Sequence, residues 1–282
     1  MISEEIFARE ERRLGKSVHY HDGRWWVESA PFYYKPIHEF NPFPPKSARP
    51  RPIKAVAGYS HQVPVPAMAN RQVVYNVLDG DNLRKFSMES LKPAKRRAVR
   101  KGQKDCVIDF ITPTDENLEQ IRLCNISLAE RCEGVREPGS FKPASYYMEH
   151  ASQWREDIMA LFHHKGHRFV GAFVDNKLVA YINLIIIEDT WSFSAIKSIT
   201  EHLEHRPVDV LYFSLLTQAS QASVSGECKR VINGGGIDEL ESLARFKADY
   251  MLLPVAFPYY SHTILPLDTL RRLKSLINFS RR

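Results

Sequence analysis

The sequence predicts an α/β protein whose sheet is mixed and mostly antiparallel, with helices flanking it. Residues 167–174 and 177–187 are two apolar runs separated only by Asp175-Asn176, which is a two-residue hairpin signal. In residues 190–198 apolar side chains alternate with serine and threonine, a period-two pattern that predicts a half-buried strand. Together these segments predict a three-strand antiparallel meander with one buried face.

Two helices and one further strand complete this region. Pro207 stands at the first position of a segment with helical spacing that extends to Ala222. A buried strand over 229–233 leads into Gly234-Gly-Gly236, and a second helix is expected over 237–250. Glycines after a strand let the main chain approach a ligand closely, and they are equally consistent with a simple turn.

The first 87 residues predict less regular structure. Residues 2–14 indicate a short solvated helix, 18–27 a hairpin and 73–78 a strand. Nine prolines between Pro31 and Pro66 interrupt any long helix or central strand. Because six aromatic residues persist through this stretch, we expect a packed coil rather than a disordered linker. It either lines a substrate cleft or covers the sheet.

Further elements are expected before the meander and at the end of the chain. The sequence predicts a basic helix before residue 105, a strand over 106–111, and helices over 116–131 and 144–162. A last helix over 267–279 has apolar residues on one side and basic residues on the other. We expect it to dock through its apolar side, and contact with a membrane surface is the alternative.

Composition describes an ordinary globular protein. The 282 residues, 44% of them hydrophobic and 26% charged, suffice for one large domain or two small ones. The formal net charge of +6 favours acidic or phosphorylated partners such as CoA, RNA or anionic lipid, and it also fits a basic protein without such a partner. The four cysteines have no Cys-x-x-Cys spacing, so neither a zinc site nor a disulfide framework is predicted.

The sequence shows no sign of membrane insertion or export. No apolar run approaches the roughly 18 to 20 residues that span a bilayer. The first residues, Met1-Ile-Ser-Glu-Glu5, are acidic and unlike a secretory signal. The expected location is the cytoplasm.

Two local sequences resemble a known family. Asn233-Gly-Gly-Gly236 followed by Ser242-Leu-Ala-Arg-Phe-Lys-Ala-Asp-Tyr250 is similar to the Gly-rich strand end and Leu-x-x-Phe-Lys helix of the Fem-type branch of the GNAT-like N-acyltransferases. Upstream, Ser87-Met-Glu-Ser-Leu-Lys-Pro-Ala-Lys-Arg-Arg-Ala-Val-Arg-Lys-Gly102 resembles that family's basic element. The resemblance covers roughly residues 87–262 and rests on both motifs occurring in order around this strand pattern.

The resemblance implies a GNAT-like domain preceded by an abbreviated GNAT-like half. Fem-type proteins carry two GNAT-like halves, and too few residues precede the basic helix here for a complete first half. We therefore expect an abbreviated N-terminal half with its Pro-rich segment at 1–87, a GNAT-like acyltransferase domain at 88–265 and a C-terminal basic helix at 266–282. Substrate contacts that the family draws from its first half are in doubt.

The same resemblance implies where a carrier would bind. In this fold the third meander strand diverges from the strand at 229–233, and its exposed backbone amides hold the carrier. The following helix presents its N-terminus to a pyrophosphate. The glycine motif of CoA-using GNAT enzymes is absent here, and Glu201, Glu204 and Asp209 stand in its place, which argues against CoA. The implied carrier-binding residues are Ser194, Ile196, Lys197, His205, Arg206, Asn233, Gly234 and Gly235.

Lys247 is the first candidate for a catalytic residue. In the Fem-type pattern the Phe246-Lys247 pair places an ammonium at the reaction centre, where it stabilises negative charge. A surface lysine on an amphipathic helix is the alternative. Tyr181 and Glu188 are further catalytic candidates, because a strand and a strand end present them, although each also fits a structural role.

The basic helix is the candidate contact for a polyanion. Lysine and arginine occupy more than one of its faces, so it can grip a nucleotide diphosphate or a tRNA backbone, or it is simply solvated. With Phe246, the substrate-binding candidates are Arg96, Arg97 and Arg100.

Other chemistries lack their motifs. The sequence contains no Gly-x-Ser-x-Gly, Walker loop or His-Glu-x-x-His, and His163, His164 and His167 have no carboxylate or cysteine at ligand spacing, so no metal is predicted. We expect an N-acyltransferase that moves an acyl or aminoacyl group from acyl-CoA or aminoacyl-tRNA, as co-substrate rather than bound cofactor, to an amine acceptor. The alternative is a non-catalytic protein of this fold that binds a phosphorylated ligand or RNA.

Overall fold

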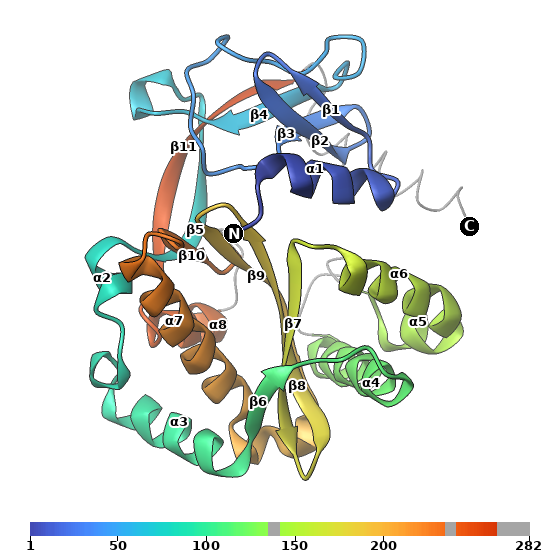
Figure 1. The fold of residues 1–282 in the computed structure, drawn as a ribbon, viewed down its shortest axis with the longest axis vertical. Coiled ribbons are helices and arrows are strands. Elements are labelled where there is room, and N and C mark those ends of the chain that lie inside the picture. Colours follow the sequence, from blue (N-terminus) through green and yellow to red (C-terminus); the bar gives the residue numbers. More distant parts are fainter. Residues whose placement is uncertain (135–141, 235–240, 264–282) are drawn as a thin grey trace. The chain divides into compact units, whose positions relative to one another are not determined.

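The computed structural model describes residues 1–134, 142–234 and 241–263 (Figure 1). These residues form two compact units. The large unit contains residues 76–234 and 241–253, and the small unit contains residues 2–75 and 254–263.

A mixed sheet forms the centre of the large unit. The strand order is β5, β10, β9, β8, β7, β6, and every neighbouring pair is antiparallel except β10 and β9, which are parallel. The bounds are β5 Arg71–Asp79, which enters the large unit at Asn76, β6 Val107–Phe110, β7 His167–Val174, β8 Lys177–Ile187, β9 Thr190–Ser198 and β10 Arg230–Ile232.

Helices cover both faces of this sheet (Figure 1). The helices on one face pack on a core that includes Val99, Leu211 and Leu216, while those on the other face pack around Leu118, Ile121 and Trp154. The first face carries α2 Gly80–Arg84, α3 Pro93–Asp105, α7 Pro207–Val224 and α8 Glu241–Ala248; the second carries α4 Asp115–Cys132, α5 Ala144–Glu149 and α6 Ala151–His163.

Local sequence accounts for the ends of several elements. Asp175 and Asn176 both have positive φ, at 48° and 63°, as a two-residue hairpin turn between right-twisted strands requires. Thr114 caps α4 by accepting the main-chain N–H of Asn117 at 3.2 Å. Pro207 takes the first position of α7, where its missing N–H costs nothing.

The small unit has its own core and contains the other strands of the same sheet. The strand order is β1, β2, β3, β4, β11, β5, with β3 and β4 parallel. Trp26 is fully buried in the core, with Phe43 and Tyr59 edge-on to it at ring-centroid distances of 6.0 and 5.8 Å. The bounds are α1 Glu4–Arg13, β1 Val18–His21, β2 Arg24–Ala30, β3 Tyr33–Pro36, β4 Gly58–Gln62 and β11 Leu253–Thr263.

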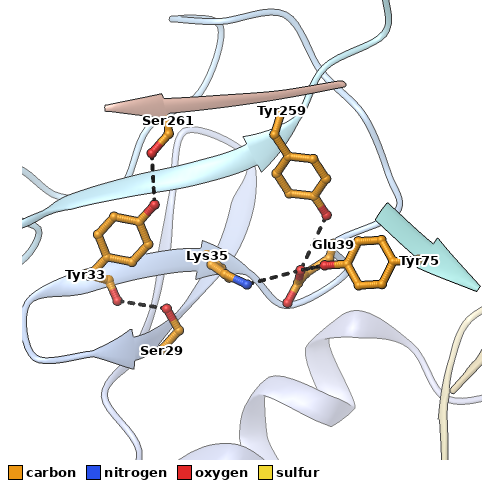
Figure 2. A network of polar contacts seen from close by, with 7 residues as sticks. All are labelled: Ser29, Tyr33, Lys35, Glu39, Tyr75, Tyr259 and Ser261. Atoms are coloured by element: carbon orange, nitrogen blue, oxygen red, sulfur yellow. Dashed lines mark hydrogen bonds and ion pairs between the residues drawn. The ribbon is translucent and has the colours of Figure 1, made fainter. Parts of the chain in front are cut away.

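A polar cluster in the small unit joins β3, β5 and β11 through one carboxylate (Figure 2). Glu39 accepts hydrogen bonds from the hydroxyls of Tyr75 and Tyr259, at 3.2 and 3.4 Å, and from the Lys35 ammonium at 3.5 Å. Burial, followed by the nearby Glu39 charge, raises the pKa of both tyrosines, so they are hydrogen-bond donors at neutral pH.

The structure confirms the predicted meander and adds strands that the sequence did not predict. The three expected strands match β7, β8 and β9 in their bounds. The Pro-rich segment is ordered, but it contains β3 and β4 rather than coil alone, and β11 was not predicted at all. The helix expected over 144–162 is two helices that meet at His150. The predicted helix at 267–279 lies outside the described residues.

Among the described residues, none of the helices combines the length and the apolar character needed to cross a bilayer.

Gly102 allows α3 to approach the start of α7, and we expect Gly102→Ala to destabilise the protein. A Cβ at this position would lie 2.8 Å from both the Arg206 carbonyl oxygen and Val210 Cβ. The cost of such overpacking, about 1–3 kcal/mol, exceeds the roughly 1 kcal/mol that alanine gains over glycine in a helix. Chemical denaturation measures the loss; the neighbouring exposed variant Gln103→Ala is the control and should change stability little.

We expect the small unit to lose stability as the pH is lowered, because of His19. Its Nε2 accepts the Arg51 N–H at 3.1 Å, and burial, then the Lys54 and Arg51 charges, lower the pKa of His19 from 6.5 to about 4. As the pH falls, the unfolded chain therefore binds a proton at His19 before the folded chain does. The contribution of His19 to stability is complete above pH 6.5 and is lost as the pH falls towards 4.

Melting curves of the wild type and of His19→Gln between pH 7 and 4.5 test this expectation. Glutamine keeps an acceptor but does not titrate, so the variant should lose less stability over this range. Parallel pH profiles for the two proteins would contradict the assignment.

Candidate functional site

The sheet of the large unit opens between β9 and β10. Their pairing covers only three residues and ends where Ile232 meets Ser192. Beyond this point the chain stays with β5: Asn233 N–H donates to the Asn76 carbonyl at 2.9 Å, and Asn76 N–H donates to the Gly234 carbonyl at 3.0 Å. β9 continues along β8 as far as Ser198. In the described part of the chain, residues 193–198 have no strand partner on the side facing away from β8.

Lys247 lies at this opening. It is only 4% exposed, and its Nζ donates to the main-chain carbonyl of Asn233 at 2.9 Å. Gly234 has a positive φ of 55°, and a Cβ there would lie 3.4 Å from the Lys247 Nζ. The glycine thus brings the strand end close to the ammonium. The structure does not place Lys247 on the solvated side of α8, which was the alternative that the sequence left open.

Aromatic side chains surround the strand end. The Asn233 side-chain amide donates to the Tyr212 hydroxyl. The Tyr212 ring contacts Phe193 at 5.4 Å and Phe246 at 4.9 Å between centroids. Because Phe193 is the first β9 residue beyond the pairing with β10, this cluster lies where the two strands part. The apolar surroundings lower the local dielectric and strengthen the field of the Lys247 charge.

A buried ion pair occupies the first turn of α7. The Asp209 carboxylate accepts from the Lys95 ammonium at 3.0 Å and from the Tyr250 hydroxyl at 2.7 Å. Lys95 also lies over the Phe246 ring, 4.2 Å from its centroid. The carboxylate therefore takes up part of the positive field at this helix end, where the family resemblance implied a carrier pyrophosphate.

A groove lies between α3 and α8, beside this ion pair. Its volume is about 420 Å³, within the range of small-molecule sites. The lining carries both charge signs and comprises Lys95, Glu241, Ser242, Arg245, Phe246 and Asp249.

The candidate carrier-binding residues are divided between two places. Ser194, Ile196 and Lys197 lie on the part of β9 beyond its pairing with β10, and Ser194 is exposed. His205 and Arg206 precede α7; the His205 ring nitrogen lies 3.3 Å from an Asp105 carboxylate oxygen. Asn233 and Gly234 form the strand end beside Lys247, and Gly235 lies outside the described residues.

The structure does not bring Tyr181 or Glu188 to Lys247. Tyr181 packs in the core beside α4, across the sheet from the core that contains Phe246, and it receives a hydrogen bond from Asn125 at 2.9 Å. Burial raises the pKa of its phenol. Glu188 lies in the β8–β9 turn, next to the paired end of β9 rather than the open end.

The basic candidates lie on α3. Arg97 and Arg100 are exposed, and Arg96 is half-buried. Sequence reasoning grouped Lys95 with these residues and missed its pairing with Asp209, which is 114 residues away. It also missed Tyr212. The one available signal was that Lys95 and Val99, four residues apart, share the helix face that packs on α7.

Comparisons with solved structures support this architecture. The DUF2156 domain at the C-terminus of an Agrobacterium fabrum protein assigned as a lysylphosphatidylglycerol synthetase has a TM-score of 0.56 at 12% identity, covering 98% of this chain and 94% of that one. L-PGS from Bacillus licheniformis has a TM-score of 0.56 at 13% identity, covering 93% and 89%. FemX has a TM-score of 0.54 at 9% identity, covering 96% and 93%.

No family model matches the sequence, and no curated protein matches it. At these identities the likeness concerns the fold. The protein has a GNAT-like fold of the Fem type, with a mixed, mostly antiparallel sheet flanked by helices.

We expect Lys95→Met to cost about 3 kcal/mol of stability, because it leaves the buried Asp209 carboxylate without its cation. Lys92→Met, at the N-cap of the same helix, is the matched control. Lys92 pairs with Asp249 at 2.8 Å, but its side chain is 71% exposed, so its loss should cost at most about 1 kcal/mol.

Urea denaturation of both variants measures the difference. Adding Asp209→Leu to Lys95→Met should recover part of the loss, since the unpaired charge is then removed. Equal effects of the two lysine variants would contradict a buried ion pair.

Proposed function

We propose that this protein transfers an acyl or aminoacyl group from a carrier to an amine. The observation that carries the proposal is the buried Lys247 ammonium, held at the point where β9 and β10 separate. A carbonyl placed in this opening develops negative charge on its oxygen as the amine attacks, and a fixed positive charge in an apolar surrounding stabilises that charge.

The reaction needs little covalent help from the protein. The amine nitrogen forms a bond to the carbonyl carbon, the ester or thioester bond to the carrier breaks, and the amine proton leaves with the carrier or with water. The edge of β9 at residues 193–198, which has no strand partner on one side among the described residues, can align the donor, and alignment alone contributes strongly to such reactions. We assign no general base.

For the donor we favour aminoacyl-tRNA over acyl-CoA. In the first turn of α7 the buried Asp209 is neutralised by Lys95, and the exposed Glu201 and Glu204 lie close before it in the chain, so this helix end lacks the surplus of positive charge that a CoA pyrophosphate would need. By contrast, α3 exposes Arg97 and Arg100, together with Lys101 and Lys104. A row of exposed cations on one helix suits a phosphate backbone.

The names of the similar structures agree with this donor class. The Agrobacterium fabrum protein is named for joining lysine to phosphatidylglycerol, which is the transfer of an aminoacyl group. The identity to it is 12%, and its name supports the donor class alone.

A carrier-binding experiment tests the donor. Purified protein is titrated with aminoacyl-tRNA, uncharged tRNA and acyl-CoA of several chain lengths while its melting temperature is followed. We expect saturable stabilisation by tRNA that weakens steeply with added salt. Stabilisation by acyl-CoA alone would overturn the donor, and binding without turnover of any amine would favour the non-catalytic alternative.

We expect Lys247→Met to reduce turnover by about 10²–10³-fold, the usual effect of removing one group that stabilises an oxyanion. Circular dichroism and melting curves show whether the variant is folded. Lys177→Met, which removes an exposed lysine at the start of β8, is the control and should retain full turnover. A folded Lys247→Met protein with wild-type turnover would refute the role of this residue.

A further inference from the structure

The small unit contains a pocket of about 400 Å³, which we call the Tyr59 pocket. Its floor is one face of the β4–β11 pair: the register places His262 opposite Tyr59 and Tyr260 opposite His61, so all four side chains point to the same side. The wall is the Pro-rich segment that connects β3 to β4. The lining residues from that segment are Lys46, Arg49, Pro50, Pro52, Ala55 and Val56.

The surface of the pocket is aromatic and apolar. Tyr59 contacts Tyr260 and His262 at ring-centroid distances of 6.4 and 5.6 Å, with tilted planes. Two prolines, an alanine and a valine complete the apolar part of the lining. Aromatic rings together with aliphatic side chains favour a planar ligand, which gains both contact area and ring–ring interaction.

The hydroxyl of Tyr59 is available for a ligand. Tyr59 is 9% exposed, yet its hydroxyl makes no hydrogen bond to any residue that the structure describes. Burial raises the pKa of this phenol, so it is a donor at neutral pH. The hydroxyl oxygen is open to solvent, and the acceptor atom of a bound ligand can take the place of water there.

The charges that line the pocket are all of one sign. Lys46 and Arg49 are exposed, and neither forms an ion pair within the described ranges, while none of the nine lining residues carries a carboxylate. The main chain at Arg49 is fixed on both sides, because its N–H donates to Asp22 at 3.3 Å and its carbonyl lies 2.9 Å from the His21 ring nitrogen. The Arg49 side chain therefore extends from an anchored main chain.

We propose that the Tyr59 pocket binds a planar aromatic ring that carries a phosphate or carboxylate group. The ring lies against Tyr59 and Tyr260, and the anion is bound by Arg49 and Lys46 at the rim. Arginine suits this position because its planar fork matches both kinds of anion. This inference is independent of the proposed transferase activity.

Isothermal titration of the full chain with four probes tests the chemistry. Adenosine 5′-monophosphate and 2-naphthoate carry both a ring and an anion, whereas adenosine lacks the anion and inorganic phosphate lacks the ring. We expect one of the first two to bind saturably and at least tenfold more tightly than either partial probe. Preference for the nucleotide or for the naphthoate separates a nucleotide source from an aryl acid source.

Two substitutions locate the binding. Arg49→Gln should weaken it about tenfold, as loss of a charge-assisted contact does, and Tyr59→Phe should weaken it about fivefold, as loss of one hydrogen bond does. The phenylalanine variant should fold normally, because the hydroxyl has no described partner. Arg51→Gln is the matched control: it is an exposed arginine of the same segment that does not line the pocket, and it should bind like the wild type.

Three outcomes would overturn the proposal. The first is that neither ring-bearing anion binds. The second is that inorganic phosphate binds as tightly as the nucleotide, which would make the site a general anion site. The third is that Arg49→Gln and Tyr59→Phe both bind as tightly as the wild type, which would place the ligand elsewhere on the chain.

Discussion

Two main-chain hydrogen bonds at Asn76 set the geometry of the large unit. They hold Asn233 and Gly234 against β5, so the chain that follows β10 cannot also follow β9. The edge of β9 is left open in consequence, and the Asn233 carbonyl is turned to where Lys247 can reach it. A protein of this fold gains an opening in its sheet without a missing strand, because backbone pairing is satisfied on the β5 side instead.

The sequence predicted those parts of the fold that depend on residues close together in the chain. The Asp175-Asn176 turn and the alternation in residues 190–198 act within a few residues, and both were predicted with their bounds. β4 and β11 were missed because their pairing joins residues about two hundred positions apart, and because Pro254 and Pro258 interrupt the strand pattern. Such long-range pairing leaves no periodic signal in either segment.

The same contrast between local signals and long-range packing applies to the candidate site. The Phe-Lys pattern led to Lys247, and in the structure its ammonium lies beside the Asn233 carbonyl. Tyr181 was chosen because a strand presents it, but alternation alone does not say which face of a two-sided sheet a residue occupies. The Lys95–Asp209 pair depends on how α3 crosses α7, so only the packed structure could reveal it.

The small unit takes its strands from both ends of the described chain. β1 to β4 are made early in synthesis, yet β11, which lies between β4 and β5 in the sheet, is made only after the whole large unit. Until residues 254–263 leave the ribosome, β4 has an unpaired edge and the Tyr59 side chain lacks Tyr260 beside it. The large unit can therefore acquire its native contacts first. During that time the unpaired edge of β4 has to be kept from pairing with a wrong strand.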